Sequence, residues 1–269
     1  MYICIDIGGT KTLVAALTNE GVISESVRFP TPKDYDEFLR ELTNAVKGFK
    51  TQGFRAGATG MPVTIFDRKR CIGVSFSNLP WQKVPIQRDL EKLFACPMLV
   101  ENDAKLAALS ESMLIKDYRK ILYVTISTGI GEALVVNNQI ITAVGDGGGR
   151  TMLFEYKGKM TPWEDFAGGK AIAKTYGKPA SEIHDPAIWK KIARNLTPGF
   201  LQFIAILQPE VIVVGGGAGH YLERFHDALV ADLRQYETPM LQIPPIIPAQ
   251  RPEEAVVYGC YDYARQNYS

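Results

Sequence analysis

Residues 2–14 place groups that bind phosphate and metal ions between two β-rich runs. The groups are a carboxylate, two glycines, a hydroxyl and an ammonium: Asp6, Gly8, Gly9, Thr10 and Lys11. Because glycine has no Cβ, backbone N–H groups at such a turn approach phosphate oxygens closely, and several amides can face one anion. The carboxylate would hold Mg²⁺ or its water shell, since hard cations take oxygen ligands and bridge phosphates. Taken alone, the stretch is also compatible with an ordinary structural hairpin.

A second copy of this stretch lies 121 residues further along the chain. Residues 2–14 align without a gap with residues 123–135, matching the tyrosine, most apolar positions and the first glycine. Internal similarity at this period predicts two halves built on one plan, each offering a glycine hairpin to a cleft between them. Two phosphate-binding hairpins that face each other are typical of the actin-like ATPase (ribonuclease H-like) fold, an α/β fold.

Length and charge narrow the classes of partner. At 269 residues the chain can bury large cores, and two domains of about 130 residues each are expected. The formal net charge is +1, so neither nucleic acid nor an anionic membrane is expected as the main partner. The basic cluster Arg68, Lys69 and Arg70 lies between short apolar runs and is interpreted as a solvated hairpin tip.

Cysteine usage and hydropathy predict a cytoplasmic protein. The four cysteines are far apart, with no CxxC pair, as is typical of buried thiols in a reducing compartment. The first strand is expected to begin within two residues of the N-terminus, which leaves no room for a signal peptide, and no stretch has ~18 uninterrupted apolar residues.

The elements that must position these groups alternate between strands, glycine turns and helices, as in an α/β protein. Helices are expected over residues 34–47, 185–207 and 253–266, the second interrupted at Pro198 and Gly199.

Two segments that follow or end predicted strands are candidates for the walls of a site. The small residues within 57–62 suit either close backbone approach or a tight bend. Residues 97–104 run from an apolar strand straight into a helix through the polar junction Glu101, Asn102 and Asp103. Strand ends that feed helices line the crevices of α/β folds, so chemistry is expected at this junction.

Four segments together carry a family likeness that spans nearly the whole chain. They are, in chain order, Asp6-Ile7-Gly8-Gly9-Thr10-Lys11, Glu101-Asn102-Asp103-Ala104, Ser127-Thr128-Gly129-Ile130-Gly131 and Val213-Val214-Gly215-Gly216-Gly217. In this order and at these separations they resemble the ROK family of sugar kinases and sugar-responsive repressors. Each segment is unspecific by itself, whereas the ordered set is specific.

The resemblance implies an actin-like ATPase fold in which a sugar and Mg-ATP meet in a cleft between two domains. The smaller domain would span residues 1–103 and be completed by the helix 253–266, and the larger domain would span residues 104–252. Eleven residues would bind the nucleotide and its Mg²⁺, with Asp6 as the metal ligand. They form the two phosphate hairpins and the glycine run beside the nucleoside: Asp6, Gly8, Gly9, Thr10, Lys11, Thr128, Gly129, Gly131, Gly215, Gly216 and Gly217.

By the same resemblance, Asn102 would contact sugar hydroxyls and Asp103 would be the catalytic base. A sugar hydroxyl is a poor nucleophile, and a fixed carboxylate can align its oxygen and accept its proton as the new P–O bond forms. The competing interpretation is that Asp103 or Asn102 caps the helix beginning at Ala104, since both residue types are favoured there. The two roles are compatible, because the dipole at a helix N-terminus keeps a carboxylate ionised.

The family pattern fails after the second hairpin. Family kinases usually carry Gly-Glu-x-Gly-His there, followed by a cysteine cluster that binds zinc with that histidine, whereas this chain has Gly149-Arg150-Thr151-Met152-Leu153. No cysteine lies between Cys96 and Cys260, so we expect no zinc. Arg150 and Leu153 would replace the glutamate and histidine that hold the sugar.

Two residues near this departure are candidates for the sugar pocket. Glu164 matches a family segment in which a glutamate grips sugar hydroxyls, and its alternative role is a first-turn acid favoured by the helix dipole. Arg150 would suit an acidic or unusual substrate, because a guanidinium favours planar anions. Its alternative is a side chain turned to solvent from a glycine loop.

The leading prediction is a kinase that transfers the γ-phosphoryl group of Mg-ATP to a hydroxyl of a hexose or N-acylhexosamine. A nucleotide- and sugar-binding protein that has lost phosphotransfer stays open, as does polyphosphate as donor, although the glycine run at 215–217 favours a nucleotide. We do not expect a repressor, because its DNA-binding segment would precede the first hairpin, which begins at Tyr2. Homodimers are common in the family, so a homodimer is a candidate state.

Overall fold

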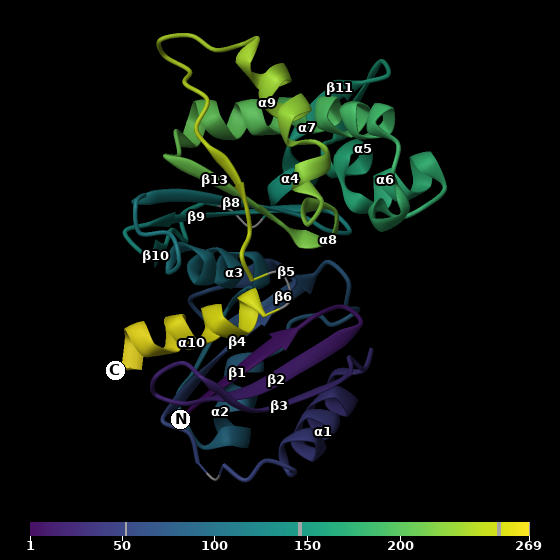
Figure 1. Ribbon diagram of the computed structural model, residues 1–269. Coiled ribbons are helices and arrows are strands. Elements are labelled where there is room, and N and C mark those ends of the chain that lie inside the picture. Colours follow the sequence, from purple (N-terminus) through teal and green to yellow (C-terminus); the bar gives the residue numbers. More distant parts are fainter. Residues whose placement is uncertain (52, 145–146, 252–253, 269) are drawn as a thin grey trace. The chain divides into compact units, whose positions relative to one another are not determined.

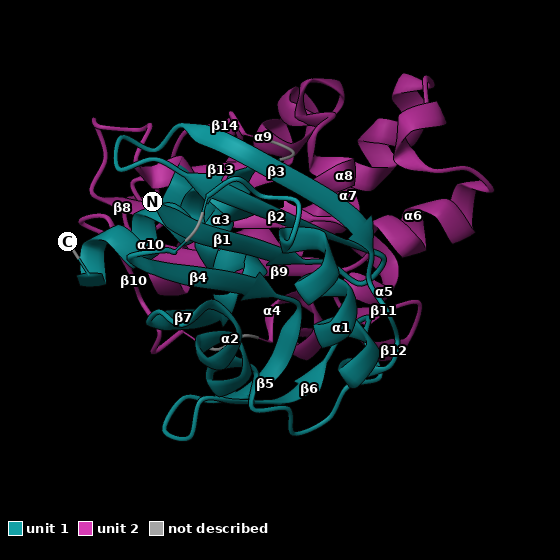
Figure 2. Ribbon diagram, turned by 90° about the horizontal axis from the view of Figure 1, so that it is seen from below, with its two compact units in different colours: residues 1–110, 253–269 teal, residues 111–252 magenta. Residues whose placement is uncertain are grey.

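Two sheets organise the chain, one in each of two units (Figure 1). The computed structural model describes residues 1–51, 53–144, 147–251 and 254–268. Unit 1 comprises Met1–Ser110 and Glu253–Ser269, and unit 2 comprises Glu111–Pro252 (Figure 2). Pro252 and Glu253, where the predicted boundary to the last helix falls, lie outside the described residues.

Within its described residues, unit 1 contains a five-stranded sheet in the order β3-β2-β1-β4-β7. The strands are β1 (Tyr2–Ile7), β2 (Lys11–Leu17), β3 (Ile23–Pro30), β4 (Ala56–Met61) and β7 (Met98–Asn102), and a separate hairpin is formed by β5 (Val63–Asp67) and β6 (Ile72–Phe76). The helices are α1 (Tyr35–Val46), α2 (Ile86–Phe94), α3 (Asp103–Ser112), which begins in this unit, and α10 (Ala255–Tyr268).

The alternation of side chains along β1 decides which residues face the helices on each side of the sheet. Ile3, Ile5 and Ile7 belong to the core that contains the buried residues of α1 and α2. A strand has a period of two, so Asp6 belongs to the opposite face. That face is covered by α10, where Tyr2 meets Tyr261 edge-on with ring centroids 5.4 Å apart.

Helix α1 is favoured by a capping side chain, and helix α2 by apolar residues that recur every four positions. The Asp34 side chain accepts a hydrogen bond from the backbone N–H of Glu37 at 2.8 Å and caps α1, so this helix has the predicted limits. The apolar residues Ile86, Leu90 and Phe94 of α2 are buried and four residues apart. Both helices therefore bury one apolar face.

Within its described residues, unit 2 contains a five-stranded sheet in the order β10-β9-β8-β13-β14. The strands are β8 (Lys120–Ile126), β9 (Ile130–Val136), β10 (Gln139–Ile140), β13 (Val211–Gly215) and β14 (Ile246–Pro248), with a separate hairpin of β11 (Leu153–Tyr156) and β12 (Lys159–Pro162). The helices are α4 (Gly148–Thr151), α5 (Glu164–Ala167), α6 (Gly169–Tyr176), α7 (Pro186–Leu207), α8 (Gly216–Gly219) and α9 (His226–Arg234), and the short 3₁₀ turns are Ala180–Glu182 and Leu222–Arg224. The core joins Leu122, Val124 and Ile126 of β8 to the helices.

The two sheets repeat one topology, which confirms the internal repeat. Each sheet places an antiparallel hairpin and a third antiparallel strand on one side and two parallel strands on the other. Asp6 pairs with Gly60 in the first sheet, and Thr125 pairs with Gly215 in the second. The equivalent positions 6 and 125 differ by 119, not 121, and this shift of two residues leaves every side chain on its original face.

Helix α7 runs through Pro198, so the predicted interruption there is wrong. A proline inside a helix removes one hydrogen bond and costs about 3 kcal/mol. Packing offsets this cost, because Phe200 and Phe203 lie against the ring of Trp163, at centroid distances of 6.1 and 5.7 Å. In the part of the chain that the structure describes, no helix combines the length and the apolar content needed to cross a bilayer.

Candidate active site

In the described part of the chain, the turn of the first hairpin presents backbone amides without an acceptor. Gly8 N–H donates to the Lys11 carbonyl at 2.9 Å, and the Lys33 ammonium donates to the Gly9 carbonyl at 2.7 Å. Among the described residues, the N–H groups of Gly9 and Thr10 have no acceptor. The turn is therefore held through its carbonyl groups while two adjacent N–H donors are left for an anion.

A row of five residues crosses the unit 1 sheet beside this turn. Strand pairing aligns Arg28, Leu13, Asp6, Gly60 and Glu101 in that order. Residues 57–60 are thus part of β4, and the interpretation of this segment as a tight bend is wrong. Because Gly60 has no side chain, residues of α3 and α10 approach its backbone closely.

Asp6 and Asp103 influence each other across the bare backbone of Gly60. A Cβ at Gly60 would lie 3.5 Å from the Cα of Asp103. Burial and the nearby Asp103 charge raise the pKa of Asp6 from 3.8 to about 7, and Arg28 opposes the rise. Two carboxylates that repel each other favour a cation between them or a shared proton. Asp6 therefore fits the predicted magnesium ligand.

The polar junction between β7 and α3 is tied down by the side chain of Asn102. Its Oδ1 accepts hydrogen bonds from the N–H groups of Ala104 at 2.9 Å and Lys105 at 3.3 Å, and its Nδ2 donates to the Val63 carbonyl at 3.1 Å. Asp103 Oδ1 also accepts from Ala104 N–H, at 2.8 Å. The capping interpretation is therefore confirmed for Asn102, and these bonds use one of its two Nδ2 hydrogens.

Glu101, the residue before this cap, forms an ion pair that the sequence did not predict. Arg68 Nη1 lies 2.5 Å from Glu101 Oε2, and Nη2 donates to Oε1 at 2.8 Å. Glu101 is fully buried, and its Oε1 also accepts from Asn102 N–H at 2.7 Å. The hairpin β5–β6 confirms the predicted hairpin tip, but a solvated Arg68 is wrong, because its guanidinium binds Glu101 at the end of β7.

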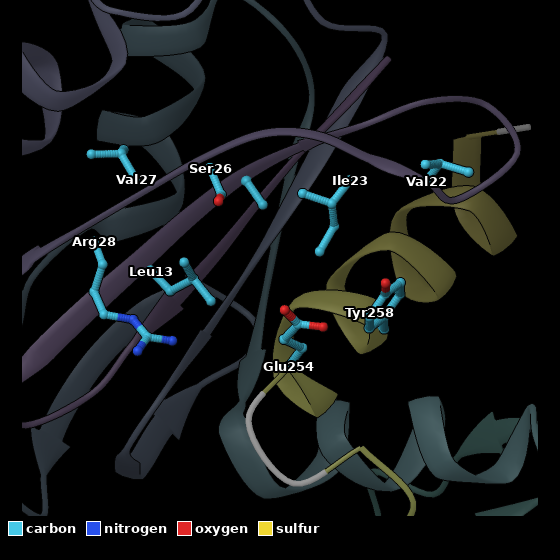
Figure 3. A pocket seen from close by; sticks show the side chains of 9 residues that line it. Leu13, Val22, Ile23, Ser26, Val27, Arg28, Glu254 and Tyr258 are labelled. Atoms are coloured by element: carbon cyan, nitrogen blue, oxygen red, sulfur yellow. The ribbon is translucent and has the colours of Figure 1, made fainter.

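A hollow of about 570 Å³ in unit 1 is lined by residues other than the predicted site residues. Figure 3 shows it between the β2 and β3 side chains, which include Leu13 and Arg28, and the side chains of Glu254, which precedes α10, and Tyr258 of α10. None of the predicted site residues lines it. We therefore assign it no part in the candidate site.

The turn of the second hairpin is built like the first. Ser127 N–H donates to the Gly129 carbonyl at 2.9 Å, and the Thr128 carbonyl accepts from Lys170 N–H at 3.0 Å. In the described part of the chain, the N–H groups of Thr128 and Gly129 have no acceptor. Gly131, the third predicted residue of this hairpin, lies inside β9 and pairs with Thr125.

The predicted sugar contact Glu164 lies directly on this second turn. Glu164 Oε2 accepts from Ile130 N–H at 3.3 Å, and a Cβ at Gly129 would lie 2.1 Å from the same oxygen. Arg150 Nε donates to Glu164 Oε1 at 3.1 Å. Glu164 thus lies in the first turn of α5, as its alternative role requires, and it also contacts the second hairpin. Arg150 is half exposed and pairs with Glu164.

The glycine run after β13 also lies near the second hairpin. A Cβ at Gly216 would lie 2.5 Å from Thr125 Oγ1 and 2.7 Å from Ser127 Oγ. Gly215 and Gly216 line a hollow of about 140 Å³ together with His220, whereas Gly217 is exposed. Unit 2 thus brings together the predicted phosphate, sugar and nucleoside contacts.

The described residues contain no group of three or more His, Cys, Asp and Glu side chains that could hold a metal ion. Magnesium needs fewer protein ligands, because it keeps several waters and is held by one or two carboxylates together with substrate phosphates. The carboxylates of Asp6 and Asp103 fit that requirement.

Known families, proteins and solved structures match this chain over almost its entire length. The family model described as ROK family matches residues 2–267. A glucokinase from Streptomyces coelicolor is 23% identical, covering 99% of this chain and 98% of the relative. An N-acetyl-D-glucosamine kinase from Haemophilus influenzae is 26% identical, covering 96% of this chain and 97% of the relative.

A solved structure confirms the expected fold. The ROK family glucokinase from Streptomyces griseus, in complex with glucose and AMPPNP, matches with a TM-score of 0.77 and 21% identity, covering 98% of this chain and 99% of that one. The chain has the α/β, actin-like ATPase fold of these kinases.

Proposed function

Since the chain belongs to the ROK family, we propose that it is a carbohydrate kinase that transfers the γ-phosphoryl group of Mg-ATP to a hydroxyl of a hexose or N-acylhexosamine. The observation that carries the proposal is the arrangement in unit 1. Asp6 and Asp103 flank the bare Gly60 backbone, and the turn that follows Asp6 has two free amides. A metal-binding carboxylate, a proton acceptor and an anion site are the parts that phosphoryl transfer to an alcohol requires.

Each group has a distinct task in this proposal. Asp103 accepts the proton of the sugar hydroxyl and aligns its oxygen with the phosphorus. Asn102 orients the sugar through its remaining Nδ2 hydrogen, and Glu164 accepts a hydrogen bond from a second hydroxyl. The free amides of the two turns donate to phosphate oxygens. Magnesium, when bound at Asp6, supplies positive charge that neutralises the phosphates.

The acceptor and donor classes are supported by different observations. The glucokinase and the N-acetyl-D-glucosamine kinase support a hexose or N-acylhexosamine as the acceptor. The hollow beside Gly215 and Gly216 supports a nucleoside-bearing donor, because polyphosphate has no group that would fill it. A binding protein without phosphotransfer is the second candidate, since the chain lacks the Gly-Glu-x-Gly-His segment that holds the sugar in the family it resembles.

The test is a coupled assay of ADP release across hexoses, N-acylhexosamines and sugar acids. We expect sugar-stimulated turnover with ATP, and a fall in kcat of about 10²- to 10⁴-fold for Asp103→Asn, equal to about 3–5 kcal/mol of barrier. Asparagine retains the capping capacity, so the helix start is preserved. Asp36→Asn, at an exposed site in the first turn of α1, is the matched control.

The outcomes separate the candidates. Nucleotide binding without turnover above the Asp103→Asn level, for any sugar, would favour the binding protein. If turnover with polyphosphate exceeded turnover with ATP, the phosphoryl donor would be polyphosphate and not a nucleotide.

A further inference from the structure

Arg150 and Glu164 form an ion pair at the turn of the second hairpin. The two side chains are joined by the 3.1 Å contact between Arg150 Nε and Glu164 Oε1, and the other carboxylate oxygen bonds to Ile130 N–H. Because Glu164 Oε2 also packs on Gly129, the pair lies beside the free N–H groups of Thr128 and Gly129.

Two glycines bring Arg150 to this turn. Gly148 has a φ of +47°, and a Cβ there would lie 2.6 Å from the Ile130 carbonyl oxygen. A Cβ at Gly149 would lie 2.8 Å from the Cβ of Ile130. A side chain at either position would push α4 away from β9, so the glycines fix where the arginine can reach.

The electrostatics of this turn require a positive charge. An oxyanion bound to the amides of Thr128 and Gly129 would lie close to the Glu164 carboxylate, and like charges at short range repel strongly where water is partly excluded. The Arg150 guanidinium offsets the carboxylate charge. A turn with Glu164 and no arginine would bind an anion less well.

The ion pair leaves most of the guanidinium available. It uses one of five N–H donors. Among the described residues, the Arg150 side chain has no other ion pair or hydrogen bond, and 49% of it is exposed. The Nη1 and Nη2 edge can therefore bind an oxyanion with two parallel hydrogen bonds.

We propose that Arg150 is an anion-binding residue, held in place by Glu164, that presents its Nη1 and Nη2 donors to an oxyanion at the second hairpin. The inference rests on the proposed function, which supplies two sources of such an oxyanion. One is the terminal phosphate of the nucleotide, and the other is the carboxylate of an acidic sugar.

Calorimetric titration of the full chain distinguishes these sources without using turnover. The probes are the magnesium complex of AMPPNP in the absence of sugar, and glucuronate and glucose with MgADP present. The variants are Arg150→Gln and Glu164→Gln, which break the same ion pair from opposite sides. Arg234→Gln, at an exposed site on α9, is the matched control, and thermal unfolding checks that every variant folds.

A phosphate partner predicts that Arg150→Gln weakens AMPPNP binding by about 10- to 100-fold, the range for a hydrogen bond to a charged group. Glu164→Gln should then change AMPPNP binding much less, because it removes both a repelling charge and the contact that holds Arg150, and these two effects oppose each other. An acidic sugar predicts that Arg150→Gln weakens glucuronate binding by a similar factor and leaves glucose binding unchanged.

Equal losses of AMPPNP binding in both variants would overturn the proposal, since they would indicate that the pair only supports the local fold. Affinities for AMPPNP and glucuronate that stay at the Arg234→Gln level would overturn it as well, while nucleotide binding by the unaltered chain would leave the proposed function intact. An unaltered chain that binds neither AMPPNP nor any sugar would refute both.

Discussion

Replacing Arg68 by Met tests whether a buried ion pair sets the geometry of the junction at Asn102 and Asp103. Methionine keeps the apolar stem of the side chain and removes both hydrogen bonds to Glu101. Glu101 then remains buried without its counter-charge. Because its Oε1 also holds Asn102 N–H, the change reaches the start of α3 directly.

The size of the effect follows from the exposure of the two partners. Removing one partner of a buried ion pair costs about 3–5 kcal/mol of unfolding free energy. The Arg68 side chain is 33% exposed and Glu101 is not exposed at all. Once the guanidinium is gone, water can reach its place and partly solvate the Glu101 carboxylate, which reduces the cost. We therefore expect about 2–3 kcal/mol for Arg68→Met.

The same hairpin tip provides the control. Arg70 is 77% exposed, and its Nε lies 3.9 Å from Asp67 Oδ2, so Arg70→Met should change stability by at most about 0.5 kcal/mol. The double variant Arg68→Met with Glu101→Gln should recover part of the loss, because no uncompensated charge stays buried.

Urea unfolding and hydrogen exchange measure these expectations. Arg68→Met should lower the urea midpoint and speed exchange of the N–H groups of Asn102, Ala104 and Lys105. The value of kcat should also fall, because the proposed base Asp103 directly follows Asn102. Midpoints and exchange rates that match those of Arg70→Met would refute the reasoning, since the ion pair would then not support the junction.

Two further predictions concern Asp6 and the packing behind Glu164. The pKa of Asp6 lies above its ordinary value, so the folded state holds a proton that the unfolded chain releases. Without metal, the free energy of unfolding should therefore fall by at most about 4 kcal/mol as the pH rises from about 4 to about 7. Urea midpoints measured in EDTA should show this fall in the unaltered chain and not in Asp6→Asn. A Cβ at Gly199 would lie 2.3 Å from the Trp163 ring, so Gly199→Ala should cost about 1–3 kcal/mol and blue- or red-shift tryptophan fluorescence. Gly48→Ala, where the nearest atom is 3.8 Å away, should change neither midpoint nor fluorescence.

Local patterns were sufficient to predict the fold. Glycine turns between apolar runs identified both hairpins, and the apolar spacing within residues 34–47 identified α1. Pro198 was misjudged because its local cost is set against packing on Trp163, a residue 35 positions earlier in the chain. The repeat was recognised two residues out of register, since a period of two preserves the apolar pattern under that shift.

The contacts that shape the site lie between segments distant in sequence and follow no period. The pair of Arg68 and Glu101 joins a hairpin tip to a strand end, and an arginine in a run of basic residues looks the same whether it is solvated or paired. The pair of Arg150 and Glu164 depends on α4 packing against β9. Only the replacement of an expected glutamate by Arg150 pointed to it beforehand.

The two hairpins differ in how the carboxylate near each turn is compensated. Glu164 has a guanidinium as its direct partner, so the second turn carries its own positive charge. Among the described residues Asp6 has no ion-pair partner, and its raised pKa shows that Arg28 offsets the Asp103 charge and burial only in part. The Lys33 ammonium contacts the first turn at the Gly9 carbonyl and forms no ion pair with Asp6, so the carboxylates of Asp6 and Asp103 need a cation that arrives with the ligand. It follows that anion binding to the first turn should depend on Mg²⁺, whereas binding to the second should depend on Arg150.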